Sequence, residues 1–291
     1  MTAVLDYHLH LWPHGERDRQ PTLEQLADYC ARAAEEGITE IAVTEHLFRF
    51  VQADAPLAGG WQSDPNPALR AQAEAYWRQH NHADLDVYVE TVLEAKKAGL
   101  PVVLGLEVDY YHGRMDKVDA LLSGYPFDVL LGSVHWIGAW LFDVLESSVA
   151  MAEWDHRGVE AVWLAYTEAI EDLAASGACD VLAHPDVCKV AGHRPALPAE
   201  LYDRMAEAAA ASGMAAEVSS AGWRKPAGEA YPAPELLSRF HARGVPITTA
   251  SDAHRLPDVG WRTADLRPLV EAAGYTSLVA FRDRRPHTVE L

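Results

Sequence analysis

Cysteine is scarce in this sequence of 291 residues, which contains only Cys30, Cys179 and Cys188. The three residues have no spacing typical of metal ligands, so the sequence does not predict a thiolate metal site. Hydrophobic residues make up 49% of the chain. A chain of this length and composition can bury a full core, and we expect one domain spanning residues 1–291.

Long hydrophobic runs are also missing. No apolar segment approaches the length that spans a bilayer. The first predicted strand begins within a few residues of the N-terminus, which leaves no room for a signal peptide. We therefore expect a soluble, cytoplasmic protein that does not use a membrane as a partner.

Positive charge is in short supply, because 24 lysines and arginines stand against 43 aspartates and glutamates, a formal net charge of −19. Nucleic acids and anionic membranes attract basic surfaces, so this balance argues against both as partners. An acidic excess is partly what a cation-binding protein shows, since carboxylate ligands count as bare charges until a metal binds them.

Short apolar runs alternate with helical patterns along the chain. Strands are predicted at residues 4–9, 41–43, 102–106, 129–131, 181–183, 215–218 and 247–250, and helices at 23–36, 85–97, 115–122, 159–175, 201–211, 236–242 and 265–273. Seven strand–helix units of this kind favour parallel strands with right-handed crossovers, most economically a closed or nearly closed α/β barrel. Residues 48–82, rich in proline and glycine, predict an irregular excursion with one helix near residues 68–78.

Histidine and carboxylate residues follow almost every predicted strand. They are His8, His10, His14, Glu45, His46, Glu107, His135, His184, Asp252 and His254. Parallel strands place all their carboxyl ends on one side of a barrel, so these side chains are expected to converge. Their number exceeds what one ion can coordinate, which favours two or three metal ions that share Glu107 as a bridge.

The motifs at these positions resemble those of the PHP (polymerase and histidinol phosphatase) superfamily. They are His8-Leu9-His10, Thr44-Glu45-His46, Gly105-Leu106-Glu107, Gly132-Ser133-Val134-His135, Ala183-His184-Pro185-Asp186 and Ser251-Asp252-Ala253-His254. The segments Glu217–Lys225, Tyr231–Pro234 and Gly244–Asp258 are similar to the histidinol-phosphate phosphatase branch. The resemblance implies a distorted (β/α)7 barrel with a trinuclear metal centre.

The resemblance also implies a ligand set for three divalent ions, which zinc, iron or manganese could supply. The first ion is expected at His8, His10, Glu107 and Asp252, the second at Glu107, His135 and His184, and the third at His14, His46 and His254. In this scheme Glu107, Asp252 and His254 also act in catalysis, and Glu45 supports a neighbouring ligand. His14 departs from the family pattern, because Leu11-Trp12-Pro13 separates it from the first motif.

Clustered divalent ions suit the hydrolysis of a phosphate monoester, since they acidify a water and neutralise the phosphoryl oxygens. The outer phosphate oxygens need further positive charge. Arg224, Lys225, Lys189 and Arg194 follow strands and are candidates for binding them, with Arg224 preferred because a guanidinium clamps phosphate in a bidentate way. Arg255 is a further candidate.

The function expected from these features is the metal-dependent hydrolysis of a small phosphorylated substrate, L-histidinol phosphate, in histidine biosynthesis. A PHP phosphoesterase for a nucleotide or sugar phosphate shares the metals and differs only in the pocket. A metal-dependent amidohydrolase is a second alternative, although Glu107 stands where such enzymes usually carry a lysine bridge. A non-enzymatic PHP module ranks last, because the ligands are intact and the surface is acidic.

Overall fold

Seven parallel strands form the centre of the molecule in the computed structural model, which describes residues 4–13 and 20–291. The strands are β1 (Leu5–Leu9), β2 (Glu40–Val43), β3 (Val102–Asp109), β4 (Val129–Ser133), β7 (Val181–Leu182), β8 (Ala215–Ser219) and β9 (Ile247–Ala250). They are hydrogen-bonded to one another in that order. The seven-stranded parallel architecture predicted from the alternating pattern is confirmed.

The first and last strands of this sheet meet and nearly close it into a barrel. Thr249 Oγ1 of β9 donates to the carbonyl of Leu5 in β1 at 2.7 Å, and the amide of His10 donates to the carbonyl of Ala253 at 2.7 Å. Closure matters for the site, because it brings the segments after β1 and β9 side by side. The barrel is therefore the distorted seven-stranded form that the family resemblance implied.

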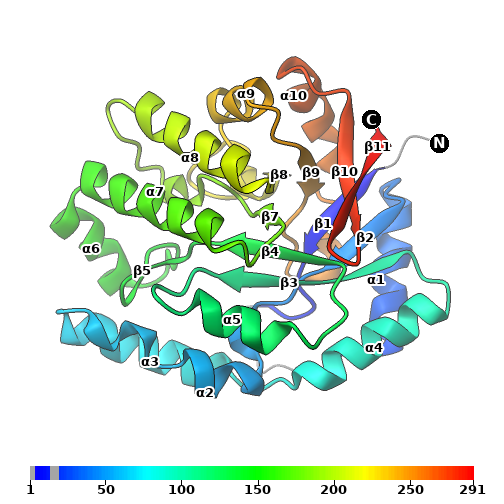
Figure 1. Cartoon of the computed structure of the whole chain (residues 1–291), viewed down its shortest axis with the longest axis horizontal. Coiled ribbons are helices and arrows are strands. Elements are labelled where there is room, and N and C mark those ends of the chain that lie inside the picture. The colour runs from blue at the N-terminus through cyan, green and yellow to red at the C-terminus, as the bar shows by residue number, and fades with distance from the viewer. Residues whose placement is uncertain (1–3, 14–19) are drawn as a thin grey trace.

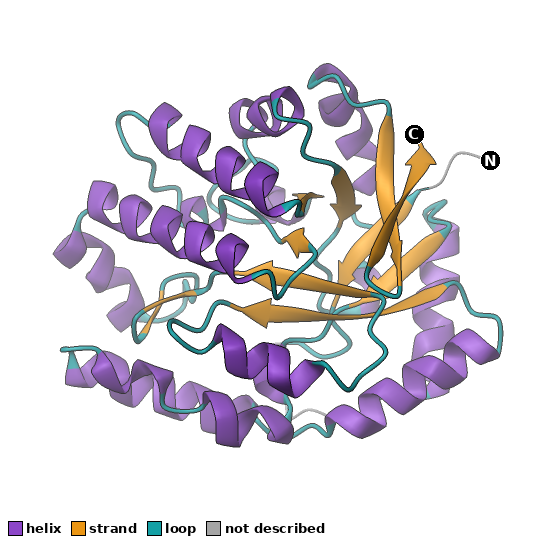
Figure 2. Ribbon diagram, in the orientation of Figure 1, coloured by secondary structure: helices purple, strands orange, loops and turns teal. Residues whose placement is uncertain are grey.

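Helices surround the strands on the outside (Figures 1 and 2). They are α1 (Leu23–Glu35), α4 (Leu85–Lys97), α5 (Met115–Leu122), α6 (Ser148–Arg157), α7 (Val159–Ser176), α8 (Ala199–Ser212), α9 (Pro234–Ala242) and α10 (Leu266–Ala272). The first begins at Thr22, whose side chain accepts a hydrogen bond from the amide of Gln25, as its capping-box sequence predicts. None of the helices in the described part of the chain is long and apolar enough to cross a bilayer.

The excursion after β2 contains short 3-10 turns, α2 (Asp54–Leu57) and α3 (Pro67–His80). Arg114, just before α5, fixes it to the barrel by donating to the carbonyls of Pro56, Leu57 and Ala58 at 3.1–3.4 Å. A small hairpin of β5 (Trp136–Ile137) and β6 (Trp140–Leu141) follows β4. The excursion and the hairpin supply aromatic side chains to the two cavities described below.

The periodicity predicts a helix as the last element of the chain. The structure instead ends in an antiparallel hairpin of β10 (Ser277–Arg282) and β11 (Arg285–Glu290). Its tight turn consists of Asp283 and Arg284, which have φ values of 50° and 60°. In a sequence, a turn of this kind is usually recognised by a glycine, and neither of these two turn residues is one. The hairpin lies at the end of the barrel where β3 and β4 begin (Figure 1).

Candidate metal centre

Most of the residues expected at the strand ends lie together at the carboxyl end of the barrel. His8, His10, His46, Glu107, His135 and His184 are buried, and Asp252 and His254 are partly exposed. Residues two apart in a strand share a face, which directs His8 and His10 to the barrel interior together. His14 lies outside the described residues, so its predicted role as a ligand is not described by the structure.

Glu107 stands at the centre of the cluster and faces two groups of imidazoles with its two oxygens. Its Oε2 lies 3.3 Å from Nε2 of His8 and 3.4 Å from Nε2 of His10. Nε2 of His10 lies 3.5 Å from Oδ1 of Asp252. These four side chains, predicted as one ligand group, therefore present their donor atoms to one small volume.

The other oxygen of Glu107 faces the second predicted group. Its Oε1 lies 3.0 Å from Nε2 of His184 and 3.4 Å from Nε2 of His135, and these two nitrogens are 3.3 Å apart. The donor atoms of a tetrahedral zinc site lie about 3.3 Å from one another, since zinc–nitrogen bonds measure about 2.0–2.1 Å. The spacing of both groups thus fits a divalent ion, and their imidazole and carboxylate donors suit one chemically.

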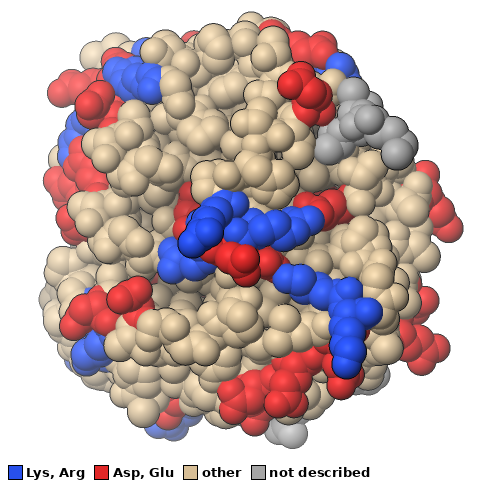
Figure 3. All heavy atoms as spheres, turned by 45° about the vertical axis from the view of Figure 1, so that its right-hand side comes forward, with Lys and Arg blue, Asp and Glu red and all other residues tan. Residues whose placement is uncertain are grey.

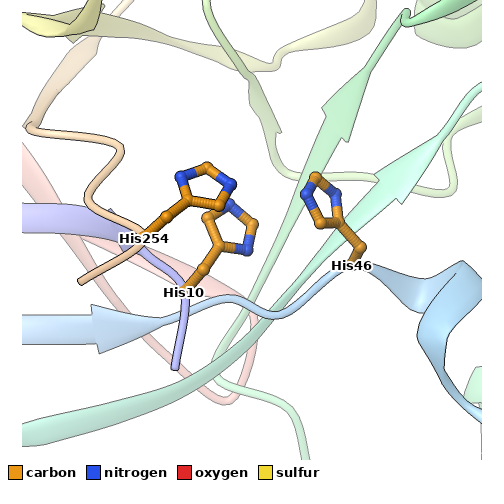
Figure 4. A group of neighbouring side chains, drawn as sticks. All are labelled: His10, His46 and His254. Atoms are coloured by element: carbon orange, nitrogen blue, oxygen red, sulfur yellow. The ribbon is translucent and has the colours of Figure 1, made fainter. Parts of the chain in front are cut away.

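A third group contains His10, His46 and His254, which offer one ligand atom each within 4.8 Å of one another. The ring of His10 stacks on each of the other two, with centroids 4.2 Å from His46 and 4.1 Å from His254, and the centroids of His46 and His254 are 5.9 Å apart (Figure 4). Nδ1 of His46 lies 2.7 Å from Oε2 of Glu107. The first and third groups therefore touch at His10 and Glu107.

Two buried carboxylates that the sequence reasoning did not select support the histidines from behind. Nδ1 of His8 lies 2.7 Å from Oε2 of Glu217, and Nδ1 of His135 lies 2.7 Å from Oδ1 of Asp109. An ionised carboxylate can only accept, so each Nδ1 donates, and Nε2 is the ring atom that can bind a metal once it has lost its proton. Asp109 could have been found from sequence, because it follows Glu107 by two residues and shares its face of β3.

The backbone is left-handed at two residues of the cluster that are not glycine, with φ 26° at His184 and 51° at Asp252. Such conformations cost about 1–3 kcal/mol and persist where the surroundings impose them. One constraint is Asp6, whose carboxylate accepts from the amide and hydroxyl of Ser251 at 2.7 and 2.6 Å. Asp6 therefore fixes the chain just before Asp252.

The charges of the cluster shift one another strongly. Burial alone lowers the pKa of His8, but the carboxylates of Glu217, Glu107 and Asp252 outweigh it and raise that pKa well above its usual range. Burial likewise opposes the neighbouring carboxylates at His135, whose pKa rises to about 10. Against the effect of burial, the surrounding histidines hold the pKa of Glu107 well below its usual range. Protons on imidazoles thus balance the carboxylates here, and a divalent ion takes the place of such protons when it binds.

A cavity of about 340 Å³ opens above the cluster. Arg224 and Lys225 line it, as does Arg255. The guanidinium of Arg224 donates to the carbonyls of Ser251 and Asp252 at 2.7 and 3.0 Å, which holds it beside the cluster. The structure thus brings the preferred phosphate-binding candidate to the predicted place.

Lys189 and Arg194 are not among the residues that line this cavity, contrary to their predicted contact with substrate. Lys189 is fully buried, and its ammonium contacts Asp186 at 2.8 Å, Glu229 at 2.7 Å and the carbonyl of Ala230 at 2.8 Å. Arg194 contacts Glu229 at 3.1 Å. Lys189 is thus paired inside the protein, whereas Arg194 is exposed and pairs with Glu229 at the surface.

Comparison with known proteins agrees with these observations. A family model described as the PHP domain matches residues 8–221. A probable histidinol-phosphatase of Deinococcus radiodurans is 32% identical over 286 residues, covering 98% of this chain and 99% of that protein. The histidinol-phosphatase of Bacillus subtilis is 27% identical, covering 88% of this chain and 95% of its own length.

Two solved structures share the fold. One is the histidinol phosphate phosphatase of Lactococcus lactis, in complex with zinc, L-histidinol and phosphate, at a TM-score of 0.67 and 20% identity over 98% of each chain. The other is a putative histidinol phosphatase of Listeria monocytogenes, at a TM-score of 0.71 and 22% identity over 90% of this chain and 99% of that one.

Proposed function

The chain belongs to the PHP family, and from this premise we propose that it is a metal-dependent phosphatase that hydrolyses L-histidinol phosphate to L-histidinol and phosphate. The observation that carries the proposal is the position of Glu107, whose two oxygens face two separate groups of imidazoles. A phosphate ester needs charge neutralised on several oxygens at once, and a carboxylate in this position can hold two ions side by side.

The ligands proposed for three ions are those that the sequence suggested. His8, His10, Glu107 and Asp252 hold the first, Glu107, His135 and His184 the second, and His46 and His254 contribute to the third. Zinc, iron or manganese suits such nitrogen and oxygen donors. Divalent ions held there supply an acidified water and positive charge opposite the phosphoryl oxygens.

The protein's own side chains complete the chemistry. Arg224, held beside Asp252, and Lys225 lie in the cavity wall and bind the outer phosphate oxygens. Glu217 and Asp109 keep His8 and His135 in the tautomer that leaves Nε2 free. The reacting ester is thereby oriented between the carboxylate-bridged cluster and the two cations.

The rest of the cavity fits an imidazole ring and an amine. Phe48, Tyr76, Trp136 and Tyr231 give it aromatic walls, on which a flat ring can pack. Asp143 also lines it, and the Oδ1 atom of this residue is buried without a hydrogen-bond partner among the described residues. We assign Asp143 to the ammonium group of the substrate, because a buried carboxylate oxygen needs a donor or a cation.

The test is phosphate release by metal-loaded protein from histidinol phosphate, a nucleotide, a sugar phosphate and p-nitrophenyl phosphate. Chelation is expected to abolish all activity, and histidinol phosphate is expected to be preferred by at least about 100-fold in kcat/KM. Asp143→Asn should raise KM for histidinol phosphate about tenfold or more and leave p-nitrophenyl phosphate within about twofold. Preference for another ester would refute the substrate, and metal-independent release would refute the mechanism.

A further inference from the structure

A second cavity, of about 310 Å³, lies next to the one above the metal centre, and Trp136 lines both. Its walls come from the excursion after β2, the segment after β3, the β5–β6 hairpin and α7. Five of its lining residues are large aromatics: Trp61, Trp77, Tyr110, Tyr111 and Trp136. We call it the aromatic cavity. Nothing in the proposed reaction uses it.

Two polar groups in its wall lack partners. The indole Nε1 of Trp61 and the hydroxyl of Tyr111 are buried, and neither has a hydrogen-bond partner among the described residues. Leaving a buried polar group unsatisfied costs about 1–3 kcal/mol. The indole N–H of Trp61 can only donate, whereas the hydroxyl of Tyr111 can also accept, so the hydroxyl is the group that a cationic N–H donor in this cavity can satisfy.

The aromatic cavity is also acidic. Glu168 and Asp172 line it from α7 and, being four residues apart, lie on one face of that helix. No lysine or arginine is among its lining residues. The faces of tryptophan and tyrosine rings attract cations as well.

The geometry favours a flat ring as part of the ligand. The rings of Trp61 and Trp136 are nearly parallel, with an interplanar angle of 18° and centroids 6.3 Å apart. Trp77 packs beside Trp61, with centroids 5.4 Å apart. Aromatic rings gain most by stacking offset or meeting edge to face, and this wall offers both arrangements to an incoming ring.

We propose that the aromatic cavity is a second ligand site, which binds a small organic cation composed of an aromatic ring and an ammonium group. The ring packs against Trp61, Trp77 and Trp136, and the ammonium group lies between Glu168 and Asp172. This inference does not depend on the phosphatase reaction, since binding is measured directly.

The probe is tryptamine, titrated calorimetrically into the metal-loaded full-length protein. A saturable site that persists in the Asp143→Asn protein is expected, because Asp143 gives the cavity above the metal centre an ammonium site of its own. Indole-3-propionate, which carries the opposite charge on the same ring, should bind this site at least tenfold more weakly. Ala165→Trp is expected to abolish binding, because Ala165 lines the cavity and a bulky side chain would fill it. Ala165→Ser is the matched control and should stay within about twofold of the parent chain.

Glu168→Lys serves as the second variant, because Glu168 is exposed and the substitution leaves packing intact. It should weaken tryptamine binding at least tenfold. This variant tests the proposal by itself if the Ala165→Trp protein does not fold. The proposal is overturned by the absence of saturable binding, or by a well-folded Ala165→Trp protein that binds normally. It is equally overturned if Asp143→Asn, in the other cavity, weakens tryptamine binding as much as Glu168→Lys does.

Discussion

The two ends of the barrel both gather buried and half-buried carboxylates, yet they neutralise them in different ways. At the end where strands begin, Glu40, Asp128 and Asp180 lie at the starts of β2, β4 and β7. Each meets a cationic side chain of the same chain: Arg282, Lys96 and Arg284 respectively. At the end where strands finish, Glu107 and Asp252 are faced by imidazoles instead.

The C-terminal hairpin supplies most of the charge at the first end. Arg284 bonds both oxygens of Asp180 at 3.0–3.2 Å and the carbonyl of Ala178 at 2.8 Å. Asp180 and Asp128 also accept from the amides of Leu130 and Leu104. In Figure 3, basic and acidic side chains alternate across the middle of the face turned forward from the hairpin side of Figure 1.

The kind of cation that faces the carboxylates indicates which end of the barrel serves stability and which serves function. Where the chain provides its own cations, the carboxylates tie strands to the hairpin and have no capacity left for an external ion. Where it provides imidazoles, the positive charge is exchangeable, because a divalent ion can replace protons that the histidines carry. The first end is therefore built to hold the barrel together, and the second to receive metal.

The largest effect is expected from the same substitution made at each end. Glu107→Gln removes the charge at the centre of the cluster and should lower kcat/KM for phosphate release by about 10³-fold or more, together with the amount of bound metal. Glu40→Gln should leave activity per folded molecule within about twofold. Steady-state kinetics and elemental analysis of both purified variants provide the measurement.

The two variants also show which results would contradict the assignment of stability to one end of the barrel and function to the other. Full activity in Glu107→Gln would show that the cluster does not bind the catalytic metal. A comparable loss in Glu40→Gln, in protein that is folded by circular dichroism, would show that the strand-start end takes part in catalysis.

A smaller effect, on stability alone, is expected from Arg284→Met. It leaves the carboxylate of Asp180 largely buried without its cation, and we expect the free energy of unfolding to fall by about 1–3 kcal/mol near neutral pH, a range that allows for the partial exposure of Arg284. Urea unfolding measures the change. Asp180→Asn in the Arg284→Met background should recover part of it, since the buried charge is then gone.

The same variant has a pH signature. Burial raises the pKa of Asp180 above its ordinary value, and Arg284 lowers it only in part. The folded state thus binds this proton more tightly than the unfolded state, so the contribution is favourable below about pH 4 and is lost as pH rises through the folded pKa. Without Arg284 that pKa rises further, and the deficit of Arg284→Met should be larger at about pH 7.5 than at about pH 4.5. A deficit that grows toward acid would contradict this account.

The sequence alone predicts the barrel and the residues that converge in it, because both follow from local pattern. Strand–helix alternation gives the order of the elements, and the position just after a strand places His135 and His184 at one end. Glu217 was not selected, because its bond to His8 joins β8 to β1 across 209 residues. The pattern after β7 predicts Lys189 at the substrate, but the 3-10 turn there directs its side chain inward to Asp186, and no local signal in the sequence reveals that direction.

The smallest effect distinguishes the two ends through a pair of buried tyrosines. Tyr7 Oη donates to Glu40 and accepts from the amide of Phe281 at 3.2 Å, whereas Tyr29 Oη donates to the carbonyl of His10 at 3.2 Å. Phenylalanine at either position should cost about 1 kcal/mol in urea unfolding, because each change removes a hydroxyl that forms buried hydrogen bonds. Only Tyr29→Phe should also lower kcat, by about three- to tenfold, since it loosens the chain at His10. Because Tyr7 lies beside His8 in β1, a larger loss of kcat in Tyr7→Phe than in Tyr29→Phe would mean that this strand couples the two ends.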